Sequence, residues 1–234
     1  KDQGDLAGAG ILYEESLGLQ RRLGNRAGIA LAVNNLAILA QLRGDRAAAR
    51  PLYEESLRIR RELGDRSGIA ASLNNLGALV EALGDKAAAI GHLEESVEIR
   101  RSLGDRWGAA VSLNNLGRLA TEAGDLNRAR AYYEEGLATF RDLGDRSGTA
   151  VALNNLGIVL SSLGESSAAK EFLAESLSTS WDLGDLKAAA GLLQELALIE
   201  APSDPMRAAR LLTCAARFSA SSERAVAEKD AVRS

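Results

Sequence analysis

Four short motifs recur every 40 residues along this chain of 234 residues, and they constrain its fold more than any other feature. An Asn-Asn-Leu motif begins at Asn34, Asn74, Asn114 and Asn154, and a Leu-Gly motif begins at Leu23, Leu63, Leu103, Leu143 and Leu183. A Glu-Glu motif begins at Glu14, Glu54, Glu94 and Glu134, and a Gly-Asp motif begins at Gly4, Gly44, Gly84 and Gly124. Because all four motifs share one register, the chain is a tandem array of supersecondary units.

Each unit contains two helices, as residues 65–104 illustrate. Asp65 is a good N-cap, and Gly64 before it can end the previous helix in a left-handed conformation. Apolar residues then recur at helical spacing, which predicts one apolar stripe at Ile69, Leu73, Leu76 and Val80. Gly84 and Asp85 end this helix and cap the next one, and so short a connection makes the two helices antiparallel.

Small residues mark the expected crossing of the two helices. The first helices carry Ala37, Gly77, Gly117 and Gly157 there, and the second helices carry Ala49, Ala89, Ala129 and Ala169. Residues of this size let the helices approach closely, and a bulky residue would cost about 1–3 kcal/mol in overpacking. One hairpin cannot bury both of its faces, so the stacking of neighbouring hairpins predicts an all-α solenoid.

The repeat boundaries predict a single array over residues 1–218. We expect a lone second helix over 5–22, full hairpins over 26–62, 66–102, 106–142 and 146–182, a degenerate capping hairpin over 186–218, and a polar tail or short helix over 219–234. Pro51 lies inside a second helix, where it removes a backbone hydrogen bond and should kink the helix. The chain starts without signal-peptide character and without an initiator Met, so we expect a segment of a longer protein.

Composition limits the classes of function. The formal net charge of −4 does not suit a nucleic-acid-binding protein, which needs clustered basic charge. No apolar run approaches the roughly 18 residues that would span a membrane. The single cysteine, Cys214, rules out an intrachain disulfide and favours a reducing cytoplasm. With His92 as the one histidine and no His/Cys cluster, the sequence predicts no metal, no cofactor and no catalytic residue.

The unit resembles the tetratricopeptide repeat. Leu73, Leu76, Gly77, Ala89 and Leu93 match that family's pattern of large and small residues, in a unit lengthened from the usual ~34 residues. The Leu-Gly-Asp-Arg and Asn-Asn-Leu-Gly motifs resemble the 40-residue repeats of Leu-Gly-Asn-repeat scaffolds and kinesin light chain. The resemblance implies a right-handed superhelix of hairpins that binds proteins or peptides and has no enzymatic activity.

The array also resembles repeats near the C-terminus of large bacterial signalling ATPases and transcriptional regulators, and residues 206–212 resemble the close of such regulators. This resemblance implies a sensor or interaction module within a larger bacterial signalling protein. The alternative is a structural spacer or self-association element that has no specific peptide ligand. Gln194 and Glu195 replace the Asn pair and Asp204 replaces the loop glycine, so the last hairpin is interpreted as a cap.

In solenoids of this family the first helices line a concave groove. At ~100° per residue, one face carries Ala71, Asn74, Asn75 and Ala78, opposite the apolar stripe. We therefore predict that the second Asn of each pair projects into the groove, at Asn35, Asn75, Asn115 and Asn155. Asn costs a helix about 0.5 kcal/mol relative to Ala, and one amide can bond both a peptide N–H and a C=O. The alternative, preferred for the first Asn of each pair, is bonding between neighbouring helices.

The remaining groove positions are mostly apolar. They are Leu31, Val111, Val151, Ile38, Ala78 and Ile158, with Arg118 as the one cation. The groove lacks the lysines that clamp a C-terminal carboxylate in chaperone-binding relatives, so an internal segment with apolar anchors fits it best. The occupant is either another protein or a segment of the parent protein, which would be autoinhibition. Candidate rim residues that would pair with acidic ligand groups are Arg26, Arg66, Arg106 and Arg146; solvation or a bond to a neighbouring loop is the alternative.

Overall fold

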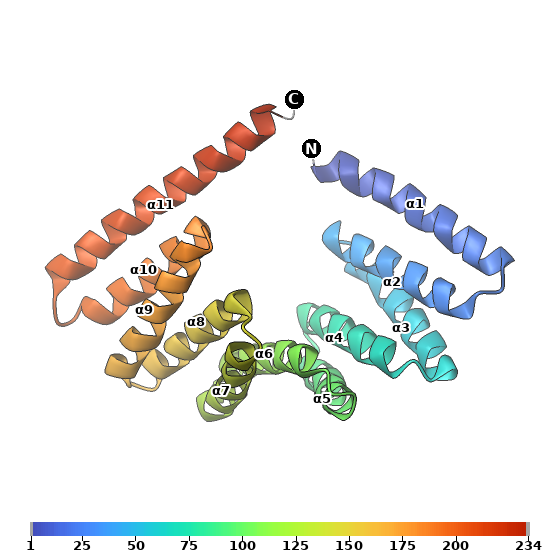
Figure 1. Cartoon of the computed structure of the whole chain (residues 1–234), viewed down its shortest axis with the longest axis horizontal. Coiled ribbons are helices and arrows are strands. Elements are labelled where there is room, and N and C mark those ends of the chain that lie inside the picture. The colour runs from blue at the N-terminus through green and yellow to red at the C-terminus, as the bar shows by residue number, and fades with distance from the viewer. Residues whose placement is uncertain (1, 233–234) are drawn as a thin grey trace. The chain divides into compact units, whose positions relative to one another are not determined.

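The computed structural model describes residues 2–232, with side chains from residue 6 to residue 221. Over this range the chain forms eleven helices and no strand (Figure 1). They are α1 (Asp2–Arg22), α2 (Arg26–Leu42), α3 (Arg46–Leu63), α4 (Arg66–Ala82), α5 (Lys86–Ser102), α6 (Arg106–Glu122), α7 (Leu126–Asp142), α8 (Arg146–Ser162), α9 (Ser166–Asp182), α10 (Leu186–Glu200) and α11 (Pro205–Val232). The predicted all-α class is confirmed. None of these described helices is both long and apolar enough to cross a bilayer.

The chain divides into two compact units between Leu116 and Gly117, within α6. In the first unit α1 packs on α2, α2 on α3, α3 on α4 and α4 on α5; in the second unit α7 packs on α8, α8 on α9, α9 on α10 and α10 on α11. Each unit therefore has the construction of an α-solenoid. Helix α11 continues to Val232, across most of the segment where we expected a polar tail or short helix, because residues 219–232 contain no glycine or proline to end it.

Glycine and aspartate set the helix ends. Gly64, after α3, has a φ of 68°, a left-handed conformation that glycine adopts at little steric cost. The Oδ1 atom of Asp65 accepts a hydrogen bond of 2.9 Å from the backbone N–H of Gly68, which caps α4. The same cap recurs at Asp45, Asp85, Asp125, Asp145 and Asp185. These short connections hold successive helices antiparallel, as the sequence predicted.

The small residues lie where the two helices of a hairpin meet. Ala49, Ala89, Ala129 and Ala169 have no exposed surface. A Cβ atom added to Gly157 in α8 would lie 2.7 Å from Cγ of Leu173 in α9. That distance is too short for two carbon atoms, so glycine lets the helices of this hairpin approach to contact.

A buried serine joins the two helices of three hairpins. The serine hydroxyl of the second helix donates to a backbone carbonyl oxygen of the first helix at 2.8–2.9 Å, in the pairs Ser56 and Ala30, Ser96 and Ala70, and Ser176 and Ala150. Each buried hydroxyl is thereby satisfied. This bond explains why serine follows the glutamate pair in the repeated motif.

Amide side chains link the first helices of successive hairpins in the first unit. Asn115 in α6 donates through Nδ2 to Oδ1 of Asn74 in α4 at 3.1 Å, and the Ser112 hydroxyl donates to the same oxygen at 3.3 Å. Asn75 in α4 donates to Oδ1 of Asn34 in α2 at 3.5 Å, a long bond. The first Asn of a pair thus accepts from the following hairpin, while the second Asn donates to the preceding one. Asn75 and Asn115, which we predicted to face the groove, take part in this link.

The role of glycine at the helix crossing can be tested by comparing Gly157 with Gly91, a glycine that has free space around it. Gly157→Ala forces a methyl group against Leu173, and we expect a loss of about 1–3 kcal/mol in the free energy of unfolding. Gly91→Ala adds a methyl group to an exposed helix interior with no atom within 4 Å, and we expect a gain of about 0.5–1 kcal/mol. Urea unfolding followed by circular dichroism measures both; equal effects would contradict this account of the crossing.

The amide link makes a second prediction. Asn74→Ala leaves the donors of Asn115 and Ser112 without their acceptor, so we expect a loss of about 1–2 kcal/mol in the free energy of unfolding. The matched control is Asn35→Ala, since the Asn35 side chain makes no hydrogen bond to the described residues; it should be neutral or slightly stabilising. If the two variants unfold at the same urea concentration, the amide link contributes nothing to stability.

Candidate functional site

The predicted groove positions of the first helices lie outside the core. Leu31 is 56% exposed and Val151 is 49% exposed, large fractions for apolar side chains in a helix. Ile38 is also exposed. The other predicted groove residues are half-buried, namely Val111, Ala78, Arg118, Ile158, Asn35, Asn75, Asn115 and Asn155. These side chains reach solvent along one side of each first helix, which is what a binding surface requires.

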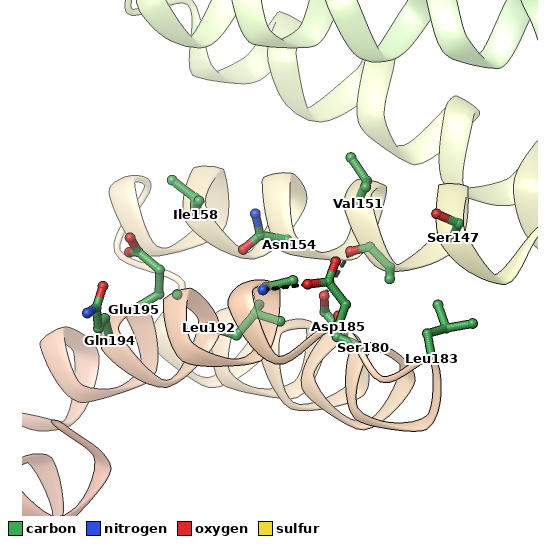
Figure 2. A pocket seen from close by; sticks show the side chains of 14 residues that line it. Ser147, Val151, Asn154, Ile158, Ser180, Leu183, Asp185, Leu192, Gln194 and Glu195 are labelled. Atoms are coloured by element: carbon green, nitrogen blue, oxygen red, sulfur yellow. Dashed lines mark hydrogen bonds between the residues drawn. The ribbon is translucent and has the colours of Figure 1, made fainter. Parts of the chain in front are cut away.

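In the second unit two of these positions border a cavity of about 280 Å³ between α8 and α10 (Figure 2). Val151 and Ile158 of α8 form part of its apolar lining, together with Leu183 and Leu192. The amide of α8 that lines the cavity is Asn154, whereas Asn155, which we predicted to face the groove, is not in the lining. In the first unit the first Asn of each pair faces the following hairpin. Asn154 is the first Asn of its pair, and it faces the following helix α10 in the same way.

The link between first helices is altered at this cavity. Glu195 occupies in α10 the position that Asn75 has in α4 and Asn115 has in α6. A carboxylate has no N–H to donate, so Glu195 cannot repeat the amide bond to Asn154. Within the described residues neither side chain makes a hydrogen bond or an ion pair. Both polar groups therefore remain available to a ligand in the cavity.

The cavity exists because a side-chain packing arrangement that recurs at the earlier junctions is absent there. At each earlier junction a large residue near the end of a second helix covers a glycine at the start of the next first helix, in the pairs Gln20 and Gly28, Arg60 and Gly68, Arg100 and Gly108, and Phe140 and Gly148. A Cβ atom on Gly148 would lie 2.5 Å from Cδ1 of Phe140, so the large side chain and the glycine share one space.

At the junction of α9 and α10 the pair is Ser180 and Ala188, and both line the cavity. The added methyl group of Ala188 is much smaller than the phenyl or guanidinium group that Ser180 lacks. Ser180 is 2% exposed, and its hydroxyl has no hydrogen-bond partner among the described residues. The sequence analysis missed this pair. Comparison of residues 40 positions apart at the end of each second helix would have found it.

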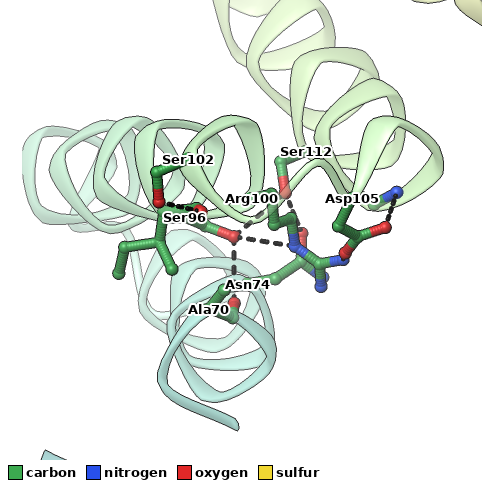
Figure 3. A network of polar contacts seen from close by, with 9 residues as sticks. Ala70, Asn74, Ser96, Arg100, Ser102, Asp105 and Ser112 are labelled. Carbon is green, nitrogen blue, oxygen red and sulfur yellow. Dashed lines mark hydrogen bonds and ion pairs between the residues drawn. The ribbon is translucent and has the colours of Figure 1, made fainter. Parts of the chain in front are cut away.

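Arg100 shows how the same space is filled in the first unit (Figure 3). Its Nη1 atom lies 2.7 Å from Oδ2 of Asp105, and its Nε donates to Oγ of Ser96 at 3.3 Å. Ser96 also exchanges a hydrogen bond of 3.1 Å with Ser112. The mostly buried Arg100 side chain is thus paired with a carboxylate and bonded to a hydroxyl, as burial of a charge demands.

The cavity itself carries negative charge. Asp185 and Glu195 line it, and no lysine or arginine is among its lining residues. The Oδ1 atom of Asp185 caps α10 by accepting from the N–H of Ala188 at 2.9 Å, which leaves its second oxygen for another donor. Neither carboxylate forms an ion pair within the part of the chain that the structure describes. Asp185 and Glu195 lie toward opposite ends of the cavity (Figure 2), so each end of the apolar lining carries a carboxylate.

The candidate rim arginines lie against their own hairpins. Arg26 forms an ion pair with Glu62, Arg146 with Asp182 at 2.8 Å, and Arg66 donates to the Ser102 hydroxyl at 3.0 Å. Each contact joins the start of a first helix to the end of the second helix of the same hairpin. These bonds correspond to the alternative of bonding to a neighbouring loop or helix end; Arg106 has the same position in α6.

A second, apolar cleft of about 430 Å³ lies between α9, α10 and α11. Leu177, Trp181, Leu193, Cys214 and Phe218 line it. Trp181 is 55% exposed, and its ring centroid lies 5.3 Å from that of Phe218.

Among the described residues, no group of three or more His, Cys, Asp or Glu side chains is arranged to hold a metal ion.

The family model described as the tetratricopeptide repeat matches the chain in four overlapping segments, residues 1–62, 28–102, 68–142 and 108–180. The search of curated proteins gave no match. Among solved structures, BtubC (BKLC) from P. vanneervenii is similar with a TM-score of 0.82 and 24% identity, over 93% of this chain and 92% of that chain.

Two other solved structures share the architecture. A putative kinesin light chain from Podosopora anserina with nearly identical TPR-like repeats has a TM-score of 0.68 and 19% identity, over 82% of this chain and 96% of its own. A Rap protein complexed with Competence and Sporulation Factor has a TM-score of 0.76 and 14% identity, over 99% of this chain and 64% of its own. At such identities the likeness concerns the fold alone.

Several independent features thus agree on one kind of protein. Motifs recur every 40 residues, each repeat folds as two antiparallel helices with small residues at their crossing, and the family model matches from residue 1 to residue 180. The chain belongs to the tetratricopeptide-repeat family, whose fold is typical of modules for protein–protein interaction.

Proposed function

We propose that this chain is a non-catalytic scaffold that binds an extended peptide segment along its first helices. The observation that carries this proposal is the cavity between α8 and α10, which Val151, Ile158 and Asn154 line. Exposed apolar side chains on a helical scaffold favour a partner that covers them, because their burial releases water. The segment belongs to another protein or to the parent protein itself.

The apolar lining and the amides have separate roles in this proposal. Val151, Ile158 and Leu183 provide area for apolar anchors of the ligand. Asn154 and Gln194 each offer a donor and an acceptor to a peptide backbone, so affinity does not depend on a particular side chain. In the first unit Leu31 and Ile38 of α2 are exposed apolar residues that can provide anchoring area of the same kind.

The four Asn residues predicted to face the groove are also part of this proposal. An amide has two N–H donors and a carbonyl acceptor, so the one bond that Asn75 or Asn115 makes to a neighbouring helix does not exhaust it. Asn35 and Asn155 lie at the equivalent positions. We propose that these four amides contact the ligand backbone, with Asn75 and Asn115 held in place by their bonds to the preceding first helix.

The cellular setting is proposed from composition and from the likeness to solved structures. One free, exposed cysteine, Cys214, suits a reducing cytoplasm. A protein of the same fold, the Rap protein, was solved in complex with Competence and Sporulation Factor, so this architecture can hold a second molecule. A sensor or interaction module of a larger bacterial signalling protein fits both observations.

The test is selection of peptide ligands by the purified chain, followed by calorimetry. We expect selected peptides to contain apolar residues, and we expect Val151→Ser with Ile158→Ser to raise the dissociation constant about tenfold or more, because two apolar contacts are lost. Met206→Ser with Leu212→Ser, two exposed residues of α11 outside the cavity, is the matched control and should bind normally. Failure to enrich any peptide, or unchanged binding by the first variant, would contradict the proposal.

Self-association is the second candidate, and the apolar cleft beside Trp181 favours it. If copies of the chain associate through this cleft, the sedimentation coefficient rises with concentration and Trp181→Ser abolishes the rise. Trp107→Ser is the matched control, since Trp107 is 53% exposed in the other unit. A monomer at every concentration would exclude this candidate.

A further inference from the structure

The cavity between α8 and α10 repeats the surroundings of Arg100, but the arginine is missing. Three side chains of the Arg100 network recur 80 residues later without change: Asn74 as Asn154, Ser96 as Ser176 and Asp105 as Asp185. All three later residues line the cavity. The residue that recurs in place of Arg100 is Ser180, which has neither the length nor the charge to reach the same acceptors.

The acceptors that hold Arg100 are present and uncompensated at the cavity. In the first unit Asp105 both caps α6 through Oδ1 and pairs with Arg100 through Oδ2 (Figure 3). Asp185 caps α10 in the same way, yet it has no cation against its second oxygen within the described residues. Ser176 donates to Ala150 as Ser96 donates to Ala70, and Ser96 in addition accepts from Arg100.

The lining carries negative charge at both ends of the cavity. Glu195 replaces the Asn of earlier repeats and lies at the end opposite Asp185 (Figure 2), and no lysine or arginine lines the cavity. At the Asp185 end, Ser180 is 2% exposed, and its hydroxyl makes no hydrogen bond within the described chain. A carboxylate within hydrogen-bonding reach favours a cation at this end through a charge-assisted hydrogen bond.

We infer that this cavity binds the guanidinium group of an arginine side chain carried by the peptide ligand. The inference rests on the proposed peptide binding and identifies one anchor residue of that ligand. The ligand arginine takes the place that Arg100 has in the first unit, with Asp185 and Ser176 as its counterparts of Asp105 and Ser96. Val151 and Leu183 lie beside it and contact the aliphatic part of the side chain.

The chemistry favours arginine over lysine. A guanidinium group is planar and has five donors, so it can bond several acceptors at once, as Arg100 does through Nε and Nη1. An ammonium group is a more compact and more strongly hydrated charge, which loses more on burial. We therefore expect arginine to bind more tightly than lysine, and citrulline, which has the same shape without the charge, to bind least.

The direct test is an NMR titration of the whole chain with N-acetyl-arginine methylamide. We expect shifts at Ser176 and Asp185, and a dissociation constant about tenfold to a hundredfold lower than for the citrulline analogue, because the bonds to carboxylate are charge-assisted. Ser180→Arg with Ala188→Gly rebuilds the pair found at Arg100 and Gly108, fills the cavity from within, and should abolish the shifts.

Two more variants guard against misfolding and non-specific binding. Ser180→Phe with Ala188→Gly copies the uncharged pair of Phe140 and Gly148, so it fills the cavity if the arginine version does not fold; helicity is checked by circular dichroism. Arg100→Ser with Gly108→Ala opens the equivalent space in the first unit, and this variant should gain a second site for the arginine derivative.

The outcomes separate this inference from the proposed function. Equal affinity for the arginine and citrulline derivatives, or binding that survives when the cavity is filled, would overturn the inference. Selected peptides that depend on Val151 and Ile158 but tolerate replacement of every arginine would overturn it as well, while the peptide-binding function would stand. If no peptide is selected, the proposed function fails, and the titration still decides whether the cavity recognises guanidinium.

Discussion

At each junction of this array but that of α9 and α10, a large side chain fills the space where the end of a second helix lies over the start of the next first helix. Arg60, a residue that is only 8% exposed, fills it with its guanidinium group, which donates to the carbonyl oxygen of Gly68 at 2.7 Å and to the Ser72 hydroxyl at 2.9 Å. Burial lowers the pKa of Arg60, and nearby Asp65 opposes the shift. Phe140 fills the same space with a phenyl ring that needs no acceptors. The junction thus tolerates polar or apolar contents, provided that the volume is occupied and each buried charge is paired.

The helix pattern could be predicted from the sequence because its markers act locally. Gly64 ends a helix through its own backbone conformation, and Asp65 caps the next through a bond to a residue three positions away. Gly157 marks the position of the helix crossing in the sequence, because the atoms nearest to it all belong to one partner helix, α9. The extent of α11 was harder to predict. Polar composition suggested a tail, whereas helix propensity and the lack of a breaker carry the helix to Val232.

The site could be predicted only in part, because its properties depend on how neighbouring hairpins meet. Helical periodicity predicted that Val151 and Ile158 share one face of α8, and both residues line the cavity. It assigned bonding between helices to the first Asn of each pair, but it could not show that the second Asn takes part in the same bond, because that bond depends on the neighbouring helix. Ser180 is an ordinary helical residue by itself. Its small size becomes significant only by comparison with the large residues at the equivalent positions of earlier repeats, Gln20, Arg60, Arg100 and Phe140.

The last junction departs from the repeat in two ways that act together. Loss of the large side chain at Ser180 opens the cavity, and Glu195 replaces the donor that would link α10 to Asn154. Either change alone would weaken the contact between the last hairpin and the one before it. Both changes leave unpaired acceptors in the lining of the same cavity, so a ligand with apolar area and N–H donors would restore the missing contacts. Because such a ligand binds the folded hairpin and not the unfolded one, recognition and stability would be coupled at this end of the array.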